Sequence, residues 1–403
     1  MNSRVSIKKL LEGVEVEWKS LWEVTIWDKK FNAVEKFKQP KIIKYHYLLS
    51  KEIKSLVTEG GNVKLLTTNL SNLYTTEELA GDIISQGEIV AIPWGGNPIV
   101  QYYNGKFLTS DNRIATSNDT KSLNNKYLYY YLLNNLDLIS SFYRGSGIKH
   151  PSMADVLDIK IPIPSLKIQS EIVRVLDNFT ELTTELTTEL SAREKQYSYY
   201  RDKLLSFEDV DVEWKKLGEV AEYSKERVSH EKLNSLNYVG VDNLLQNREG
   251  KTVSTKVPMK GNFTKYISND ILIGNIRPYL KKIWYADCDG GTNGDVLVIH
   301  VTNNTILPRY LYQVLADDNF FIYNMSHAKG AKMPRGNKAR ILDYLIPIPP
   351  LKKQKEIVAI LDKFDTITNS ISEGLPKEIA LRQKQYEYYR DRLLSFEKLK
   401  EVE

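Results

Sequence analysis

The feature that most constrains the fold of this chain is a helix-like segment that occurs twice. The stretch KQYSYYRDKLLSFE begins at Lys195 and returns as KQYEYYRDRLLSFE from Lys384, with twelve of fourteen positions identical. A second pair, IPIPSLKIQSEIVRVLDNF from Ile161 and IPIPPLKKQKEIVAILDKF from Ile346, agrees at thirteen of nineteen positions. A shorter box, VEVEWKSLWEV from Val14, returns as VDVEWKKLGEV from Val210. Since internal repeats predict duplicated structural units, we expect a variable segment and a shared helical block, each present twice and alternating.

These boxes divide the chain into four predicted segments. The first variable domain, with a short N-terminal helix, is expected over residues 1–158, and the second over residues 209–343. The shared helical blocks are expected over residues 159–208 and 344–403. Each variable segment is long enough to bury a core of its own. Their short β-rich runs, separated by Gly, Asn and Pro turns, indicate a mixed α/β fold of the α+β class.

Both shared blocks have the apolar spacing of a coiled coil. Apolar side chains recur at four-three intervals, which predicts a seam along one face of a long helix. Two seams of matching length favour antiparallel pairing of the blocks as a strut between the variable domains; in the simpler alternative, each helix only covers its own domain. The second block is slightly longer between its two repeated boxes, and this insertion forms a stutter. Gly374 and Pro376 are expected to break that block, with Pro376 in the first turn of a new helix.

Composition excludes several classes of protein. The 56 Lys and Arg residues only slightly outnumber the 51 Asp and Glu residues, so any surface that binds a polyanion must be local. The single cysteine, Cys288, excludes an internal disulfide framework. No apolar run suits a signal peptide or a membrane span, so we expect a cytoplasmic protein without membrane contact. The five histidines lack metal-ligand spacing, and no phosphate-binding loop or methyltransferase box occurs, so no catalytic or metal site is expected.

A basic loop that contains glycine precedes each Ile-Pro-Ile-Pro box. Gly145 in FYRGSGIKHPSM and Gly330 in SHAKGAKMPRGNKAR are separated by the same offset as the boxes themselves. Glycine lets backbone N–H groups approach phosphates, and Lys and Arg supply positive charge. One such loop alone indicates only solvated surface, but its recurrence favours contact with nucleic acid. The candidate residues are Arg144, Lys149 and His150 in the first loop, and Lys332, Arg335, Lys338 and Arg340 in the second.

The β-rich runs supply candidates for base recognition. Arg with guanine and Asn with adenine form the common bidentate contacts of the major groove. In the alternative interpretation, the aromatic residues belong to the core and the polar residues only hold turns. The candidates are Asn275, Arg277, Tyr279 and Lys281 in GNIRPYLKK, and Trp94, Asn97 and Arg113 in the first half.

The duplicated Ile-Pro-Ile-Pro boxes and KQYxYYRDxLL helix ends resemble the specificity subunits of type I restriction–modification systems over essentially the whole chain. The resemblance implies that each variable segment is a target recognition domain that reads one half of a split sequence in double-stranded DNA. It implies that the helical blocks space these domains and bind two methyltransferase (modification) subunits, with restriction subunits completing the nuclease. S-adenosylmethionine, ATP and magnesium would belong to those partners and not to this chain. The residues expected to form the strut and to bind partners are Tyr197, Tyr200, Arg201 and Leu204, with Tyr386, Tyr389, Arg390 and Leu393.

Two other functions stay open from the residues alone. One is a stand-alone coiled-coil adaptor or regulator that binds DNA without a methyltransferase partner, and the other is an enzyme whose site the motifs do not reveal. Methylation of a split target only in complex with a methyltransferase would favour the specificity subunit. Function without such a partner would favour the adaptor, and turnover by the isolated chain would favour the enzyme. The break at Gly374 and Pro376 has no counterpart in the first block and would make the two struts unequal.

Overall fold

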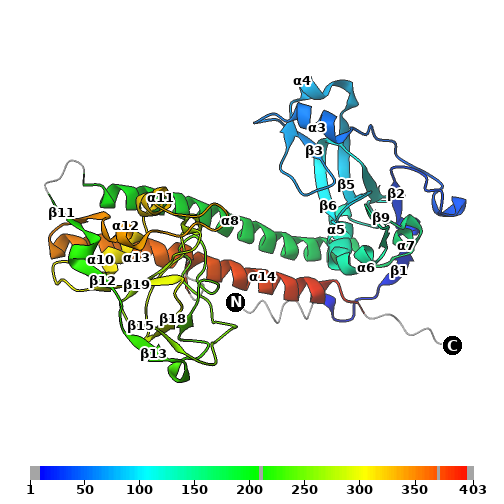
Figure 1. Ribbon diagram of the computed structural model, residues 1–403. Coiled ribbons are helices and arrows are strands. Elements are labelled where there is room, and N and C mark those ends of the chain that lie inside the picture. Colours follow the sequence, from blue (N-terminus) through cyan, green and yellow to red (C-terminus); the bar gives the residue numbers. More distant parts are fainter. Residues whose placement is uncertain (1–9, 208–211, 370–372, 397–403) are drawn as a thin grey trace. The chain divides into compact units, whose positions relative to one another are not determined.

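The computed structural model describes residues 10–207, 212–369 and 373–396. The chain divides into two compact units, Met1–Thr183 with Arg382–Glu403, and Thr184–Leu381 (Figure 1). Each unit thus contains one variable domain together with parts of both shared helical blocks. The boundaries of the four predicted segments stay predictions. The short helix expected at the N-terminus falls largely on residues 1–9, which lie outside the described residues.

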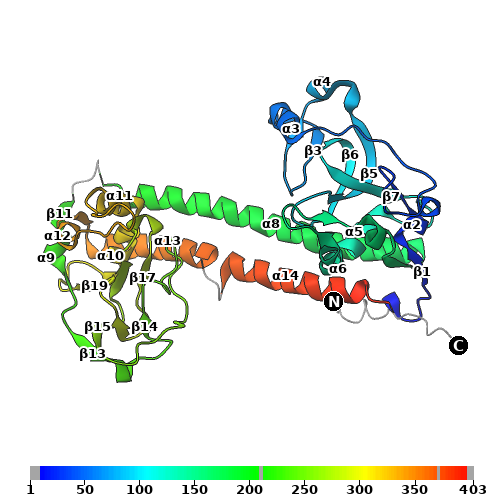
Figure 2. The same cartoon turned by 45° about the vertical axis from the view of Figure 1, so that its right-hand side comes forward.

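The first unit is built on a six-stranded sheet in the order β2-β7-β5-β6-β3-β4 (Figure 2). Neighbouring strands are antiparallel except for β3 and β6, which are parallel. A separate hairpin, β8 with β9, lies outside this sheet. The strands of the unit are β1 (Glu17–Ser20), β2 (Thr25–Trp27), β3 (Val63–Leu66), β4 (Tyr74–Thr75), β5 (Ser85–Pro93), β6 (Gln101–Thr109), β7 (Asn112–Ser117), β8 (Tyr143–Arg144), β9 (His150–Pro151) and β10 (Lys160–Ile163).

Short helices complete the first unit. The α5 helix begins after Asn124 because the side-chain Oδ1 of Asn124 accepts hydrogen bonds from the backbone N–H groups of Lys126 (2.8 Å) and Tyr127 (3.1 Å). Tyr127 is fully buried in the core that α5 shares with β5 and the start of the first helical block. The helices are α2 (Leu21–Val24), η1 (Lys36–Lys38), α3 (Ser50–Leu56), α4 (Glu77–Ala80), η2 (Gly81–Ile83), α5 (Asn125–Asn134), α6 (Leu136–Ser141) and α7 (Met153–Leu157).

The second unit has two four-stranded sheets, in the orders β12-β19-β16-β17 and β13-β15-β18-β14. Its strands are β11 (Glu213–Lys216), β12 (Ala221–Tyr223), β13 (Arg227–Ser229), β14 (Tyr238–Val239), β15 (Asn262–Tyr266), β16 (Ile271–Gly274), β17 (Ile283–Tyr285), β18 (Gly290–Thr292), β19 (Val296–Val301) and β20 (Leu345–Ile348). Its short helices are α9 (Leu217–Val220), η3 (His230–Lys232), η4 (Pro278–Leu280), α10 (Pro308–Leu315), α11 (Asp318–Ser326) and α12 (Lys338–Leu342).

Each unit contains a four-stranded antiparallel core, and the two cores have the same strand order. The order β2-β7-β5-β6 in the first corresponds to β12-β19-β16-β17 in the second. The correspondence follows the sequence repeat, since β2 and β12 begin at the same interval after the repeated tryptophans Trp18 and Trp214. Outside this core the units differ, because the first extends the same sheet with β3 and β4 whereas the second forms a separate sheet. The scaffold is therefore repeated and its periphery is not.

In each unit, the strand formed by the repeated tryptophan box pairs with the strand formed by the Ile-Pro-Ile-Pro box. In the first unit β1 is antiparallel to β10, with Trp18 opposite Pro162. In the second unit β11 is antiparallel to β20, with Trp214 opposite Pro347. Each pair forms a sheet of two strands, where proline is tolerated because an edge strand does not need every N–H for a ladder.

The helical blocks pair with each other, as the two seams predicted. The first block is one helix, α8 (Leu166–Leu205), and the second forms α13 (Leu351–Asn369) and α14 (Gly374–Leu393). Within the first unit, Phe179 of α8 stacks on Tyr389 of α14, with ring centroids 5.3 Å apart. Within the second unit, Tyr200 of α8 stacks at the equivalent position on Phe364 of α13 at 5.4 Å. The start of each block therefore packs against the end of the other, which is the antiparallel arrangement (Figures 1 and 2).

The break expected in the second block is confirmed. The α13 helix ends at Asn369 and α14 begins at Gly374, so Pro376 lies in the first turn of α14. Proline fits there because the first turn of a helix does not use its own N–H groups. Gly374 has a φ of +77°, a conformation that other residues rarely adopt.

A buried glutamine anchors each helical block to its domain. Gln169 Oε1 accepts from Asn124 N, and Gln169 Nε2 donates to Ser122 O and Pro164 O, each at 2.8 Å. Gln354, which occupies the same position of the repeated box, makes the same contacts at the same distances in the second unit. Its partners are Leu307 N, Thr305 O and Pro349 O. Both glutamines are fully buried, so each one fixes the start of a block against the turn that leads into a domain helix.

Within the part of the chain that the structure describes, no helix combines the length and the apolar character needed to cross a bilayer.

Candidate nucleic-acid interface

In the first unit, three separate segments meet at the end of β5. The loop after β5 begins at Trp94, whose backbone N–H donates to Asp111 O in the turn between β6 and β7 (2.9 Å). Further along this loop, Gly96 N donates to Lys149 O in the β8–β9 hairpin (3.1 Å). This hairpin is the predicted basic loop, and the loop after β5 carries two of the predicted base-reading residues, Trp94 and Asn97. The structure thus brings the two kinds of candidate together.

The second unit has the same backbone framework. Asn275 N donates to Asp295 O (2.8 Å), and Arg277 N donates to Pro334 O (2.7 Å). Pro334 is the counterpart of Lys149, because the two residues follow the equivalent hairpin glycines at the same interval. The loop after β16 therefore contacts the second basic loop in the way that the loop after β5 contacts the first.

Each basic loop is a hairpin closed at equivalent residues. The turn of each hairpin passes through a glycine with positive φ, +138° at Gly145 and +101° at Gly330. A Cβ at Gly145 would lie 2.9 Å from Ile148 O, which no side chain could accommodate without movement. The closing pairs are Arg144 with His150 in the first unit and Lys329 with Arg335 in the second.

Different side chains occupy these equivalent frameworks. In the first unit Arg113 Nη2 lies 3.1 Å from Asp111 Oδ1, and in the second Arg335 Nη2 lies 3.2 Å from Asp295 Oδ1. The side chain of Arg113 is buried on β7, whereas that of Arg335 is 56% exposed on its hairpin. The aspartates are common to both sites, but the arginine that each one holds comes from a different segment.

A buried network supports Trp94 in the first unit. The Arg113 guanidinium carbon lies 4.1 Å from the centroid of the Trp94 ring, and the His150 ring lies 5.2 Å from it. Arg113 Nη1 is 3.8 Å from Asp28 Oδ2, which also accepts a hydrogen bond from Tyr47 Oη (2.5 Å). Burial raises the pKa of Asp28 although these partners lower it, so ionised Asp28 costs stability at neutral pH. We infer that Asp28 and Arg113 position Trp94; that Arg113 reads a base stays a prediction.

The other predicted site residues differ in exposure. Asn275 is buried, and Arg277 and Lys281 are partly buried. Trp94 is also partly buried, with its carbonyl oxygen 2.7 Å from His150 Nδ1. The exposed candidates are Asn97, Arg144, Lys149 and His150 in the first unit, with Tyr279, Lys332, Arg335, Lys338 and Arg340 in the second.

Some of the second unit's candidates flank the site and do not join it. Lys281 Nζ contacts Asp318 Oδ1 on α11 (2.9 Å). Lys338 and Arg340 lie on α12, beyond the hairpin, with Arg340 Nη1 3.7 Å from Asp343 Oδ2. A β-bridge between Ile276 and Arg335 pairs the loop after β16 directly with the hairpin. Among the described residues, Lys281, Lys338 and Arg340 take no part in this pairing. The roles of all these residues in DNA binding stay predictions.

Sequence reasoning missed three aspartates that build the two sites. Asp111 and Asp295 each immediately precede a core strand, β7 and β19, and both accept a backbone N–H and an arginine. An acid just before a strand in each half was the available signal, but lone acids in such positions are mostly structural. Asp28 gave no signal, because its contacts with Arg113 join residues far apart in the chain.

The predicted strut residues face inward. Tyr197, Arg201, Tyr389 and Leu393 are buried, and the remaining four are partly buried. Arg201 Nη2 donates to Gln313 Oε1 (3.0 Å) and to Tyr197 Oη within the second unit. The tyrosines that reach solvent are Tyr199 (58% exposed) and Tyr388 (48% exposed), which occupy the same position of the repeated segment. The eight predicted residues therefore pack against other parts of their own units, and their role in a strut or in partner binding stays a prediction, whereas Tyr199 and Tyr388 are exposed.

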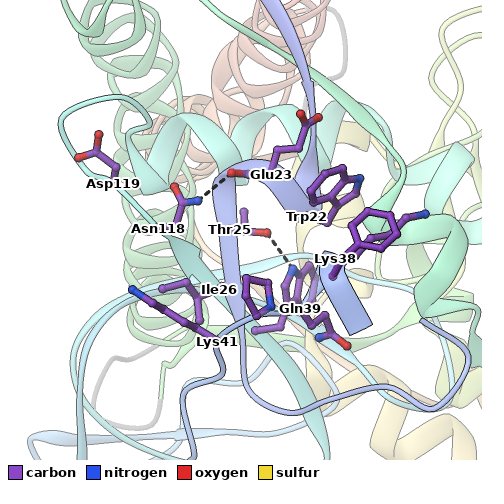
Figure 3. A pocket seen from close by; sticks show the side chains of 12 residues that line it. Trp22, Glu23, Thr25, Ile26, Lys38, Gln39, Lys41, Asn118 and Asp119 are labelled. Carbon is purple, nitrogen blue, oxygen red and sulfur yellow. Dashed lines mark hydrogen bonds between the residues drawn. The ribbon is translucent and has the colours of Figure 1, made fainter. Parts of the chain in front are cut away.

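A cavity of about 380 Å³ lies beside α2 in the first unit (Figure 3). Trp22 and Phe37 form one wall, with ring centroids 5.5 Å apart, and Asn118 Nδ2 donates to Glu23 O (2.7 Å) at another. None of the predicted site residues lines it. The repeat places Gly218 where the first unit has Trp22, so the aromatic wall has no counterpart in the second unit.

Fold and site together define a duplicated binding protein, in which two similar frameworks carry different basic surfaces. The model of the type I restriction modification DNA specificity domain matches residues 33–193 and 209–381, and the chain belongs to this family. The predicted specificity subunit is therefore confirmed, with a role in DNA sequence specificity and not in catalysis.

Relatives and solved structures agree with this assignment. The chain is 35% identical to the type I restriction enzyme EcoR124I/EcoR124II specificity subunit of Escherichia coli, over 99% of this chain and 98% of the relative. It is 32% identical to a protein of Haemophilus influenzae provisionally named a type I restriction enzyme specificity subunit, over 98% and 99%. The crystal structure of the type I restriction–modification S subunit from M. genitalium matches with a TM-score of 0.61 at 17% identity, over 96% of this chain and 98% of that one. The likeness confirms the predicted fold class.

Proposed function

We propose that this specificity subunit reads a bipartite, asymmetric sequence in double-stranded DNA, one half with each unit. The observation that carries the proposal is the repeated framework at the two sites. The same backbone hydrogen bonds hold the loop after β5 and the loop after β16 against a basic hairpin, with Trp94 at one position and Asn275 at the other. Equivalent frameworks suit two similar stretches of duplex, while different side chains suit two different sequences.

The surface of each site has the chemistry that a duplex requires. Exposed basic side chains gather on the hairpins, Arg144, Lys149 and His150 on one and Lys332 and Arg335 on the other. Cations of this kind neutralise phosphates and fix register, while the neighbouring loop meets base edges. Two nonidentical sites on one chain also remove the palindromic symmetry that a homodimer would impose on its target.

Two methyltransferase subunits would bind the helical blocks, and restriction subunits would join them. Support comes from two equivalent exposed patches. Tyr199 has the Lys203 Nζ 5.9 Å from its ring centroid, and Tyr388 has the Arg392 guanidinium 5.6 Å from its own. An exposed tyrosine beside a cation is typical of an interface anchor. Because the patches repeat, two copies of one partner can bind in the same way. S-adenosylmethionine, ATP and magnesium would be bound by those partners.

The experiment is methylation mapping of the chain in complex with its methyltransferase subunit. We expect a split target with two dissimilar halves. In a second version, residues 14–158 are replaced by the equivalent segment of a relative with another specificity, and we expect one half of the target to change and the other to persist. If both halves of the methylated sequence changed, the proposal that each unit recognises one half of the target would be wrong. Sequence-specific binding by the isolated chain, with no effect of the methyltransferase, would favour the stand-alone adaptor.

A further inference from the structure

Each basic hairpin presents a large apolar side chain to solvent at its turn. Ile148 is 70% exposed in the first unit, and Met333 is 48% exposed in the second. The two follow Gly145 and Gly330 at the same interval and so occupy the same position of the repeated hairpin. Single exposed apolar residues are common on protein surfaces and need no explanation. An apolar side chain that recurs at one position does need an explanation, because its immediate neighbours differ between the loops, Gly147 and Lys149 in the first and Lys332 and Pro334 in the second.

Backbone hydrogen bonds hold the hairpin that carries this side chain against the loop in front of it. A Cβ on Gly95 would approach Ile148 Cγ2 to 2.9 Å, so the absence of a side chain at Gly95 leaves Ile148 its place beside the loop after β5. The backbone beside each apolar residue is fixed as well, by Gly96 N to Lys149 O and by Arg277 N to Pro334 O. An apolar group held in this way loses little conformational freedom on binding.

Cations lie on both sides of each apolar side chain. The first hairpin has Arg144 before Ile148 and has Lys149 and His150 after it, all exposed. The second has Lys332 before Met333, with Arg335 after it, both exposed. A protruding apolar residue between cations suits duplex DNA, because the cations can contact phosphates on either side while the apolar group meets the base stack.

We propose that Ile148 and Met333 are wedges that enter a base step and partly unstack it, one in each half of the target. This inference rests on the proposed function, since it requires each unit to bind its own half. Ile and Met are among the side chains that proteins insert between bases to kink a duplex. The step that each wedge enters adds to specificity without a hydrogen bond, because steps differ in how easily they unstack.

The test uses the complete complex with the methyltransferase subunits and duplexes that carry 2-aminopurine at successive positions of the target. We expect the fluorescence to rise at one step in each half when the wild-type complex binds. Ile148→Ala should abolish the rise in the first half alone and weaken binding roughly fiftyfold, because roughly three CH₂ equivalents lose their contact with the bases. Met333→Ala should do the same in the second half alone. A mismatch at the affected step should restore the binding of each variant, because the step is then already unstacked.

The controls are Leu49→Ala and Met259→Ala, which truncate apolar side chains that are 73% and 88% exposed in the same units. We expect both to leave the fluorescence and the affinity unchanged. If Ile148→Ala weakens binding but leaves the fluorescence rise in place, the side chain makes an ordinary contact and the wedge is wrong, while methylation of the split target still supports two readers. If the wild-type complex shows no sequence-specific binding, the proposed function fails as well.

Discussion

At the residue scale, the two sites show how one framework holds different chemistry. Arg113 was predicted as a base reader because it lies in a β-rich run and Arg forms a common bidentate contact with guanine. Its burial comes from Asp28 and Tyr47, which belong to other parts of the first unit, and a sequence pattern contains no such long-range contact. The exposed cations of the hairpins were predictable, since glycine and basic residues recur there at a fixed offset.

Arg113→Lys is expected to impair the first half of the target alone. Lysine keeps the charge but loses the planar group beside Trp94 and the fork that reaches both Asp28 and Asp111. We expect methylation of targets altered in the first half to become less selective, and the free energy of unfolding of the chain to fall by about 1–3 kcal/mol because buried groups lose hydrogen bonds. Methylation kinetics on targets altered in either half, with urea unfolding of the complex, would measure both effects.

The matched control is Arg144→Lys, because Arg144 is 72% exposed and its ion pair with Asp155 is at the surface. We expect no measurable change in stability from that substitution. Equal loss of selectivity in both halves after Arg113→Lys would show that the network does not act locally.

At the element scale, the helical blocks were the most predictable part of the fold. The four-three spacing predicted long paired helices, and the glycine and proline of the second block predicted its break. The outer sheet of the second unit was not predictable, because β14 pairs with β18 across a long stretch of intervening chain. The role of Gln169 was also missed, since a glutamine inside a helical pattern reads as a solvent-facing residue.

Gln169→Leu and Gln354→Leu are each expected to destabilise the chain strongly. Either change removes the three hydrogen bonds of a fully buried glutamine and leaves backbone groups without these partners, which costs about 2–4 kcal/mol in the free energy of unfolding. Urea unfolding monitored by circular dichroism would measure the loss. Gln383→Leu is the matched control, because Gln383 is exposed on α14 and donates at the surface to Glu387 Oε1 (3.0 Å). If Gln383→Leu lowered the free energy of unfolding by a similar amount, the hydrogen bonds of the buried glutamines would not be the cause of the loss.

The spacing between the half-sites is expected to follow the length of α8. The stretch TELTTELTTEL, from Thr180 to Leu190, repeats a four-residue unit, and the boundary between the two compact units falls inside it, after Thr183. Inserting one more Thr-Thr-Glu-Leu unit lengthens a helix by about 6 Å and shifts the apolar stripe only slightly. We therefore expect the unread gap of the target to widen by one or two base pairs, with both halves unchanged. Methylation mapping that shows an unchanged gap would rule this out.

At the scale of the whole molecule, repetition separates what the sequence predicts from what it does not. Every repeated box has a structural role. The tryptophan box and the Ile-Pro-Ile-Pro box form a pair of strands in each unit, and the KQYxYYRDxLL segments lie in the long helices. Several positions that the halves do not share, such as Trp94 and Asn275, have partners that could not be foreseen, and the contacts of the repeated Gln169 and Gln354 were missed as well. The outward-facing tyrosines were also not distinguished, because Tyr197, Tyr199 and Tyr200 differ in exposure only once the helices are packed.

Tyr199 and Tyr388 are expected to set the number of methyltransferase subunits that bind. Tyr199→Ala or Tyr388→Ala should leave one subunit bound, and the double substitution should leave none, because each patch serves one copy. Mass measurement of the intact complex would count the subunits. Leu381→Ala, at a 44% exposed position of α14, is the control and should bind two. Two bound subunits in the double variant would place the interface elsewhere.

The exchange of helix ends between the blocks has a consequence for ancestry. Since the start of α8 packs on the end of α14, and the end of α8 packs on α13, neither recognition domain is completed by its own block alone. A polypeptide of half this length, holding one domain and one block, would have to borrow the missing helix from a second copy of itself. Such a pair would read an inverted repeat. Fusion of two such genes, followed by independent mutation of the two halves, would allow each recognition domain to acquire a different target sequence.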